Sequence, residues 1–193
     1  MKEINVAILA SGNGTNALKL IDHFNQHSKI NIAFIFSNNP NALVIDKAIN
    51  RNVKVLTCNN SILEETDFLI DNLILYSIDY ILLAGFLRKI PKIIIEKYPQ
   101  RILNIHPSLL PKFGGPGMYG IHVHKAVKEA KENISGITIH YVSEEFDKGQ
   151  PIAQFYTSIE ASDTAYDIQQ KIQKLEHTYF PFVSEQIMLS EQK

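Results

Sequence analysis

The sequence has few of the features that would place the chain outside the cell or in a membrane. Its single cysteine, Cys58, excludes an internal disulfide and favours a reducing compartment, which we expect to be the cytoplasm. No apolar run approaches the roughly 18 residues of a membrane span, and the start of the chain lacks a signal-peptide cleavage pattern. The formal net charge is −1 without a long basic run, so we expect neither a membrane nor a nucleic-acid partner.

Strand-like and helix-like segments alternate along the first hundred residues of the 193. Apolar β-rich runs predict strands at residues 4–10, 30–36, 53–57, 80–84 and 102–105. Helical spacing and caps predict helices at residues 17–24, 40–50, 61–76 and 92–97, the second opened by Pro40 and the third by a capping box at Ser61. This alternation predicts an α/β fold with a doubly wound, mostly parallel sheet.

The second half of the chain has a different order of predicted elements. Three prolines and four glycines occur between residues 107 and 120, which predicts a long functional loop. A helix at 124–131, strands at 137–142 and 152–157 and a final helix at 163–187 follow, with a kink expected at Pro181. We expect residues 1–193 to form one domain.

A glycine turn joins the first predicted strand to the first helix. Gly12 and Gly14 permit a tight turn, and the helix that follows offers free N–H groups and a positive dipole end to an anion. The spacing to Ala17 also satisfies the dinucleotide fingerprint. That fingerprint requires a carboxylate at the end of the second strand, where this sequence has Asn38 and Asn39. A phosphate monoester therefore fits the turn better than a nicotinamide dinucleotide, although a turn without any ligand stays open.

An amide and an imidazole end the fifth predicted strand. Asn104 and His106 are two residues apart, so their side chains point to the same side, at the edge where open α/β sheets bind ligands. Together they resemble a donor pair for a developing oxyanion, while the alternative is two polar residues that satisfy loop backbone. Asp147 lies in a loop between two later strands, and spacing alone does not connect it to His106.

These segments together resemble the folate-dependent formyltransferase family, in its glycinamide ribonucleotide branch. The similar elements occur in family order over nearly the whole chain, and the most specific is Asn104-Ile105-His106-Pro107-Ser108-Leu109-Leu110-Pro111. The resemblance implies the formyltransferase fold, with antiparallel C-terminal strands and a long C-terminal helix. Two departures are a loop longer than in many relatives, at residues 112–120, and Lys148 in place of a glycine.

The resemblance also implies roles for particular residues. Catalysis would fall to Asn104, His106 and Asp147. The substrate phosphate and ribonucleotide would be bound by Gly14, Thr15, Asn16, Gln173 and Glu176. The folate would contact Leu87, Arg88, Lys89, Ile90, Asn104, Ser143, Glu144, Glu145, Phe146 and Asp147. Thr138 and His140 would support the site.

The implied reaction transfers the formyl group of 10-formyltetrahydrofolate, a co-substrate, to the amine of phosphoribosylglycinamide in purine biosynthesis, without a metal. The alternatives are formyltetrahydrofolate hydrolysis, formylation of methionyl-tRNA, a nucleotide-binding oxidoreductase and a non-enzymatic nucleotide-binding module. His122 and His124 precede a helix at a spacing unsuited to a metal pair, so we expect surface or substrate-lining histidines there. A monomer and a homodimer are both compatible with the sequence.

Overall fold

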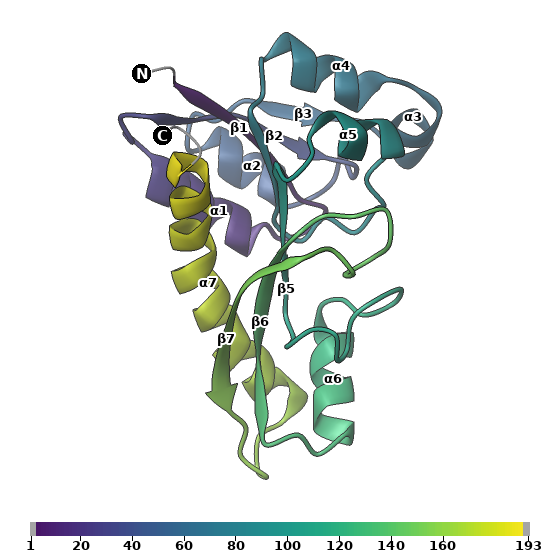
Figure 1. Ribbon diagram of the computed structural model, residues 1–193, viewed down its shortest axis with the longest axis vertical. Helices are drawn as coiled ribbons and strands as arrows, with labels where there is room; N and C mark the ends of the chain where they lie inside the picture. Colours follow the sequence, from purple (N-terminus) through teal and green to yellow (C-terminus); the bar gives the residue numbers. More distant parts are fainter. Residues whose placement is uncertain (1–2, 191–193) are drawn as a thin grey trace.

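The computed structural model describes residues 3–190, and its centre is one seven-stranded sheet in the order β3-β2-β1-β4-β5-β6-β7 (Figure 1). Strands β1 to β5 are parallel, and β6 and β7 are antiparallel to their neighbours. The strands are β1 (Ile4–Leu9), β2 (Ile30–Ser37), β3 (Val55–Thr57), β4 (Tyr80–Leu83), β5 (Ile102–His106), β6 (Ile134–Tyr141) and β7 (Pro151–Ser158). The predicted mixed α/β sheet is therefore confirmed.

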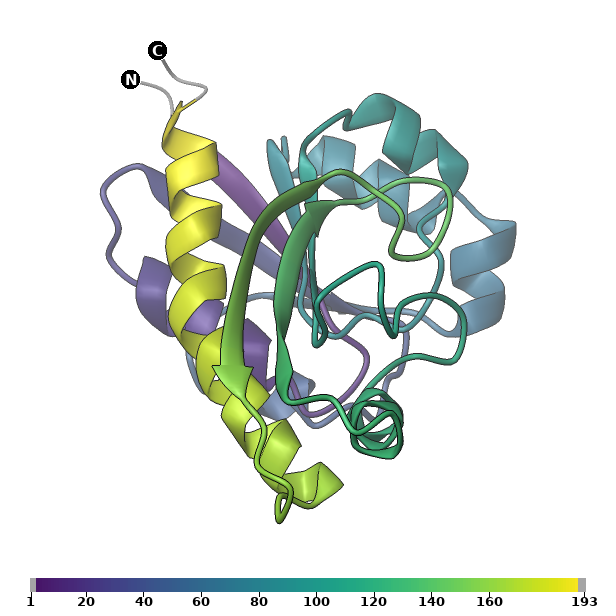
Figure 2. The same cartoon turned by 60° about the horizontal axis from the view of Figure 1, so that its bottom comes forward.

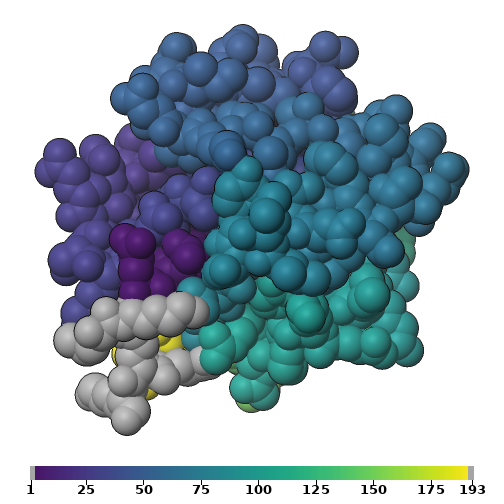
Figure 3. All heavy atoms as spheres, turned by 90° about the horizontal axis from the view of Figure 1, so that it is seen from above, coloured from purple at the N-terminus to yellow at the C-terminus, as the bar shows by residue number. Residues whose placement is uncertain are grey.

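Helices cover both faces of the sheet at its central parallel strands β1, β4 and β5, which are almost fully buried. The helices are α1 (Thr15–Phe24), α2 (Val44–Ile49), α3 (Asn60–Glu65), α4 (Phe68–Leu75), α5 (Lys92–Lys97), α6 (Ile121–Glu129) and α7 (Ala165–Ser190). Buried residues of α1, α2, α6 and α7 form one core against the sheet, and those of α3, α4 and α5 form a second core on the other face. Seen from above, the face around the start of β1 consists mainly of the middle of the chain, in blue and teal (Figure 3).

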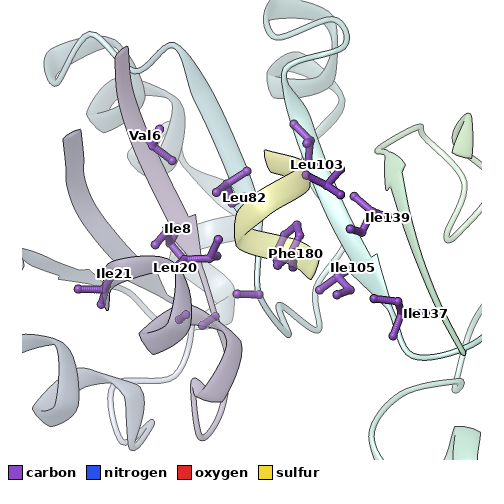
Figure 4. Close-up of a cluster of buried hydrophobic side chains, with 14 of the residues drawn as sticks. Val6, Ile8, Leu20, Ile21, Leu82, Leu103, Ile105, Ile137, Ile139 and Phe180 are labelled. Carbon is purple, nitrogen blue, oxygen red and sulfur yellow. The ribbon is translucent and has the colours of Figure 1, made fainter. Parts of the chain in front are cut away.

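The alternation of side chains along each strand divides the two cores. On β1, Val6 and Ile8 enter the first core, while Ala7 and Leu9 enter the second. In the first core, Phe180 of the C-terminal helix packs among aliphatic residues of the central strands and α1 (Figure 4). Their burial holds α7 across the sheet, and this fixes the position of the α7 residues that line the pocket.

The order of the strands reverses beside β1. Strand β2 lies on one side of β1 and β4 on the other, so the connections after these strands lead to opposite faces and leave a crevice at their carboxyl ends. Strand β6 then runs back along β5, with Asn104 opposite His140 and His106 opposite Thr138. Both residue pairs therefore lie towards the carboxyl end of β5, where the crevice opens.

Several predicted boundaries are wrong. The helix predicted at 61–76 is two helices, α3 and α4, and the N-cap of α3 is Asn59, whose side chain accepts a hydrogen bond from the Ile62 N–H, so the Ser61 capping box does not form. The helix predicted to open at Pro40 begins at Val44. Helix α7 spans Ala165–Ser190 with Pro181 inside it, and the kink expected at Pro181 stays a prediction. No helix within residues 3–190 has the length and apolar character needed to cross a membrane.

Candidate active site

A pocket of about 440 Å³ opens at the carboxyl ends of β1, β4 and β5. Five segments that are distant in sequence form its walls: the turn before α1, the segments after β4 and β5, the β6–β7 loop, and α7. In Figure 2 the loops after β5 and β6 come forward beside the end-on helix α6. Pocket position and strand order agree with the ligand crevice expected of a doubly wound sheet.

The amide of Asn104 is oriented by its cross-strand neighbour. Asn104 Nδ2 lies 3.0 Å from His140 Nε2, and His140 Nδ1 lies 2.8 Å from the Tyr141 carbonyl oxygen. Because a carbonyl only accepts, His140 Nδ1 carries the hydrogen and Nε2 accepts from Asn104. Burial lowers the pKa of His140, which suits this neutral form. One Asn104 N–H is thus used by His140, and the second remains for a ligand.

His106 and Asp147 meet at the same point. His106 Nε2 lies 2.8 Å from the Phe113 carbonyl oxygen, and Nδ1 lies 3.4 Å from Asp147 Oδ1. The side chains are only 5% and 11% exposed, so water screens their interaction little. The structure therefore brings together the three residues to which the resemblance assigned catalysis. It also shows that only Nδ1 of His106 is left for the reacting groups, because Nε2 is bonded to Phe113.

Asp147 has an unusual backbone conformation, with φ of 56°. Aspartate tolerates this left-handed region better than most residues, yet the conformation still has a cost and is frequent at functional sites. Its Oδ2 accepts a hydrogen bond of 2.8 Å from the Gly115 N–H. Oδ2 of Asp147 is thereby held by the loop after β5, while Oδ1 faces His106.

Thr138 lies behind the pocket and supports that loop. Its Oγ1 donates to the Ser108 carbonyl oxygen at 2.7 Å and accepts from the Leu110 N–H at 3.0 Å and from Gln154 Nε2 at 2.9 Å. The hydroxyl is fully buried. Thr138 therefore fixes the start of the loop without touching the cavity.

The glycine turn places the N-terminus of α1 beside the cavity. Gly14 is the N-cap of α1 with φ of 71°, and a Cβ there would lie 2.2 Å from Val44 Cγ2, so only glycine fits. Gly14 itself does not line the cavity, whereas its neighbours Asn13, Thr15 and Asn16 do. The α1 N-terminus has no side-chain cap, which leaves its N–H groups available to a phosphate.

The end of β2 carries no carboxylate. Asn38, which follows β2, accepts from Ser11 Oγ at 2.6 Å and donates to Asn60 Oδ1 at 2.8 Å. A site for the ribose of a nicotinamide dinucleotide requires an acidic side chain at this position. The structure thus lends no support to the oxidoreductase alternative.

Helix α7 closes the pocket beside the glycine turn. Gln173 Nε2 donates to Thr15 Oγ1 at 3.2 Å, and Asn16 Nδ2 donates to Glu176 Oε2 at 3.1 Å. Burial raises the pKa of Glu176 to about 7, because a desolvated carboxylate is unfavourable. Asn16 Oδ1 is buried without a hydrogen-bond partner among the residues described. This end therefore retains an unpaired hydrogen-bond acceptor of the kind that a ligand hydroxyl can satisfy.

The predicted folate residues also line the cavity, as Leu87, Arg88, Lys89, Ile90, Ser143, Glu144, Glu145 and Phe146. Two surface ion pairs cross this region, one between Arg88 and Glu64 and one between Lys92 Nζ and Glu144 Oε1 at 3.2 Å. Lys148, which stands in this loop in place of a glycine, is paired with Glu145 at the exposed surface. The Lys148 side chain thus leaves the cavity open.

The sequence alone did not decide whether His124 lies at the surface or lines the pocket. His124 is 3% exposed and lines the pocket, and its Nδ1 has no hydrogen-bond partner among residues 3–190. Burial and the neighbouring His106 lower its pKa to about 4. His122, two residues earlier, is exposed. Within residues 3–190, no three histidine, cysteine or acidic side chains gather into a metal site.

A buried imidazole with a half-buried amide and carboxylate, beside a helix N-terminus and at the switch point of a parallel sheet, defines an α/β enzyme acting on a small molecule. Comparisons with known proteins give the family. The pattern of the formyl transferase family matches residues 4–183. The chain belongs to the formyl transferase family.

Individual relatives carry a more specific name. Phosphoribosylglycinamide formyltransferase of Escherichia coli (strain K12) is 32% identical over 93% of this chain and 85% of its own length. The chloroplastic enzyme of Arabidopsis thaliana is 36% identical over 91% of this chain but only 62% of its own length, and that of Vigna unguiculata is matched over 38% of its length. The crystal structure of the Bacillus halodurans enzyme superimposes with a TM-score of 0.87 at 33% identity, covering 95% of each chain.

Proposed function

We propose that the chain transfers the formyl group of 10-formyltetrahydrofolate to the amine of 5′-phosphoribosylglycinamide, a step of purine biosynthesis. The observation that carries this proposal is the approach of His106 Nδ1 to within 3.4 Å of Asp147, next to Asn104. Family membership and the names of the relatives support the reaction and the substrates. The proposal covers residues 1–193 as one formyltransferase domain.

The reaction requires stabilisation of a tetrahedral intermediate. The amine attacks the formyl carbon, and the formyl oxygen becomes negative. The free N–H of Asn104 and a protonated Nδ1 of His106 are the two donors that we assign to this oxygen. Removal of one such donor typically lowers kcat by about 10²–10³, or roughly 2.7–4 kcal/mol.

Protons must also move from the attacking amine to the folate nitrogen that departs. Asp147 is the group that we assign to this task, because its Oδ1 faces both His106 Nδ1 at 3.4 Å and His140 Nε2 at 3.8 Å. A carboxylate here stabilises the imidazolium of His106 and can hold a water that relays the proton. Positioned acid–base groups typically contribute about 10²–10⁴ in rate.

We assign the two substrates to different walls of the pocket. We assign the phosphate and ribose to the glycine turn, where Thr15 and Asn16 face Gln173 and Glu176. We assign the pterin to the wall lined by residues 87–90 and 143–147. Both partners are small molecules. The cytoplasm is the compartment we propose, and a monomer or a homodimer is compatible with the site.

The test is an assay that follows 10-formyltetrahydrofolate spectroscopically, with and without phosphoribosylglycinamide, and detects the N-formyl product by mass spectrometry. The proposal predicts folate turnover that depends on the ribonucleotide and yields product in equal amount. Turnover without the ribonucleotide would identify a hydrolase instead. Ribonucleotide binding without any turnover would identify a binding module.

A further inference from the structure

The loop after β5 contacts both members of the His106–Asp147 pair through its backbone. The Phe113 carbonyl oxygen accepts from His106 Nε2 at 2.8 Å, and the Gly115 N–H donates to Asp147 Oδ2 at 2.8 Å. We propose that the segment 113–115 is a backbone clamp that makes Nδ1 of His106 the working nitrogen and aims Asp147 at it. This inference deepens the proposed function and rests on it.

The tautomer of His106 follows from the chemistry of the clamp. A carbonyl oxygen has no hydrogen to give, so the Phe113 contact requires a hydrogen on His106 Nε2. In the neutral ring the lone pair is then on Nδ1, which faces Asp147 Oδ1 at 3.4 Å. Proton exchange with the reacting groups therefore takes place at Nδ1 and not at Nε2.

The shape of the segment suits this task. Phe113 and Gly115 have φ angles of 56° and 97°, so the backbone turns twice through the left-handed region. A Cβ on Gly114 would lie 2.4 Å from Leu110 Cδ2 and 3.3 Å from Asp147 Cβ. The glycine at 114 thus permits the backbone to pass directly against Asp147.

A buried serine holds the clamp to the sheet. Ser108 is fully buried, and its Oγ donates to the Lys112 carbonyl oxygen at 2.6 Å and lies 3.5 Å from the Phe113 oxygen. The Ser108 carbonyl in turn accepts from Thr138 Oγ1 on β6. Ser108 does not line the cavity, so it can act on catalysis only as a positioning residue.

The first measurement is the tautomer of His106, by nitrogen NMR of the full chain labelled with ¹⁵N-histidine and assigned with His106→Gln. At a pH where the ring is neutral, the clamp requires the hydrogen on Nε2 and the lone pair on Nδ1. The opposite tautomer in the wild-type protein overturns the proposal. This measurement needs no turnover, so it decides the clamp even if the chain transfers no formyl group.

The second measurement compares the kinetics of Ser108→Ala and Ser135→Ala. Ser135 is a matched control, because it is a buried serine of β6 whose Oγ has no partner among residues 3–190. Misplacement of a catalytic group by about 1 Å can cost 10²-fold, so we expect Ser108→Ala to lower kcat by about 10- to 10²-fold. The KM of both substrates should stay unchanged, and the second His106 tautomer should appear in the NMR spectrum.

Equal kcat in Ser108→Ala and Ser135→Ala would overturn the positioning role. If Ser108→Ala does not fold, Gly114→Ala combined with Leu110→Ala gives the same test. The Leu110 change removes the 2.4 Å clash and leaves the new Cβ 3.3 Å from Asp147 Cβ. That double variant should lower kcat relative to Leu110→Ala alone, and equal kcat in the two would again contradict the clamp.

Discussion

The buried carboxyl group of Glu176 makes the stability of the fold depend on pH in a way that Glu176→Gln should remove. The folded pKa of about 7 exceeds the ordinary value of 4.5 by about 2.5. Each pH unit of such a difference is worth about 1.36 kcal/mol, which gives about 3 kcal/mol. Because the folded pKa is raised, this stabilisation is complete below pH 4.5 and is lost as pH rises to about 7.

His124 has the opposite effect in an overlapping range. Its folded pKa of about 4 lies below the ordinary 6.5, so the fold loses stability as pH falls from about 6.5 to about 4. The wild-type curve of stability against pH therefore contains two slopes that partly cancel. The difference between wild type and Glu176→Gln removes the His124 contribution, since both proteins keep that residue.

The assay is urea unfolding of wild type and Glu176→Gln at pH 4.5 and pH 8. The neutral amide cannot ionise, so the wild type should lose about 3 kcal/mol relative to the variant between these two pH values. If the difference in free energy of unfolding between wild type and Glu176→Gln is the same at both pH values within about 0.5 kcal/mol, the reasoning is refuted. Such a result would mean that Glu176 ionises as an exposed glutamate does and is not desolvated against Asn16.

Three further substitutions test separate parts of the site. Asp147→Asn should lower kcat by about 10²–10⁴ while the ribonucleotide still binds, because the base and counter-charge are lost, as steady-state kinetics and calorimetry would show. Gly14→Ala should mainly raise the ribonucleotide KM, because its Cβ would lie 2.2 Å from Val44 Cγ2 and displace the start of α1. His140→Phe should lower kcat by about 10- to 10²-fold, because the Asn104 amide loses the acceptor that orients it.

For each of these three predictions, one specific result would contradict it. Near-wild-type kcat in Asp147→Asn would remove that carboxylate from the proton transfers. An unchanged ribonucleotide KM in Gly14→Ala would separate the glycine turn from the phosphate. For His140, the conservative variant His140→Gln retains an acceptor for Asn104 and should recover part of kcat. Equal loss in both His140 variants would indicate a packing role.

The sequence predicted the sheet well because strand and helix periods are local properties. The runs at 4–10 and 30–36 became β1 and β2 with small shifts of boundary. Errors occurred where side chains compete for the same backbone groups. Asn59, two residues before Ser61, caps the first turn of α3 in place of Ser61. The predicted helix is interrupted between Glu65 and Phe68, and a continuous apolar stripe in the sequence does not reveal this interruption.

The site was predictable only in pieces. The i, i+2 spacing of Asn104 and His106 gave their common direction, since a strand has a fixed period. The contact of His106 with Asp147 joins residues 41 positions apart and depends on the antiparallel return of β6. Without that register, spacing contains no information about it, and only the family resemblance linked the two. The burial of His124 is likewise a tertiary property, because its helix shows an ordinary amphipathic pattern.

The central claim is that one carbon atom passes from folate to the ribonucleotide between Asn104, His106 and Asp147. The most direct measurement follows that carbon, with 10-formyltetrahydrofolate labelled by ¹³C in the formyl group and NMR detection during a single turnover. We predict that the label appears in the N-formyl ribonucleotide at the rate at which it leaves the folate, and that Asp147→Asn slows the transfer by about 10²–10⁴. Release of the label as free formate in the presence of the ribonucleotide would contradict the account.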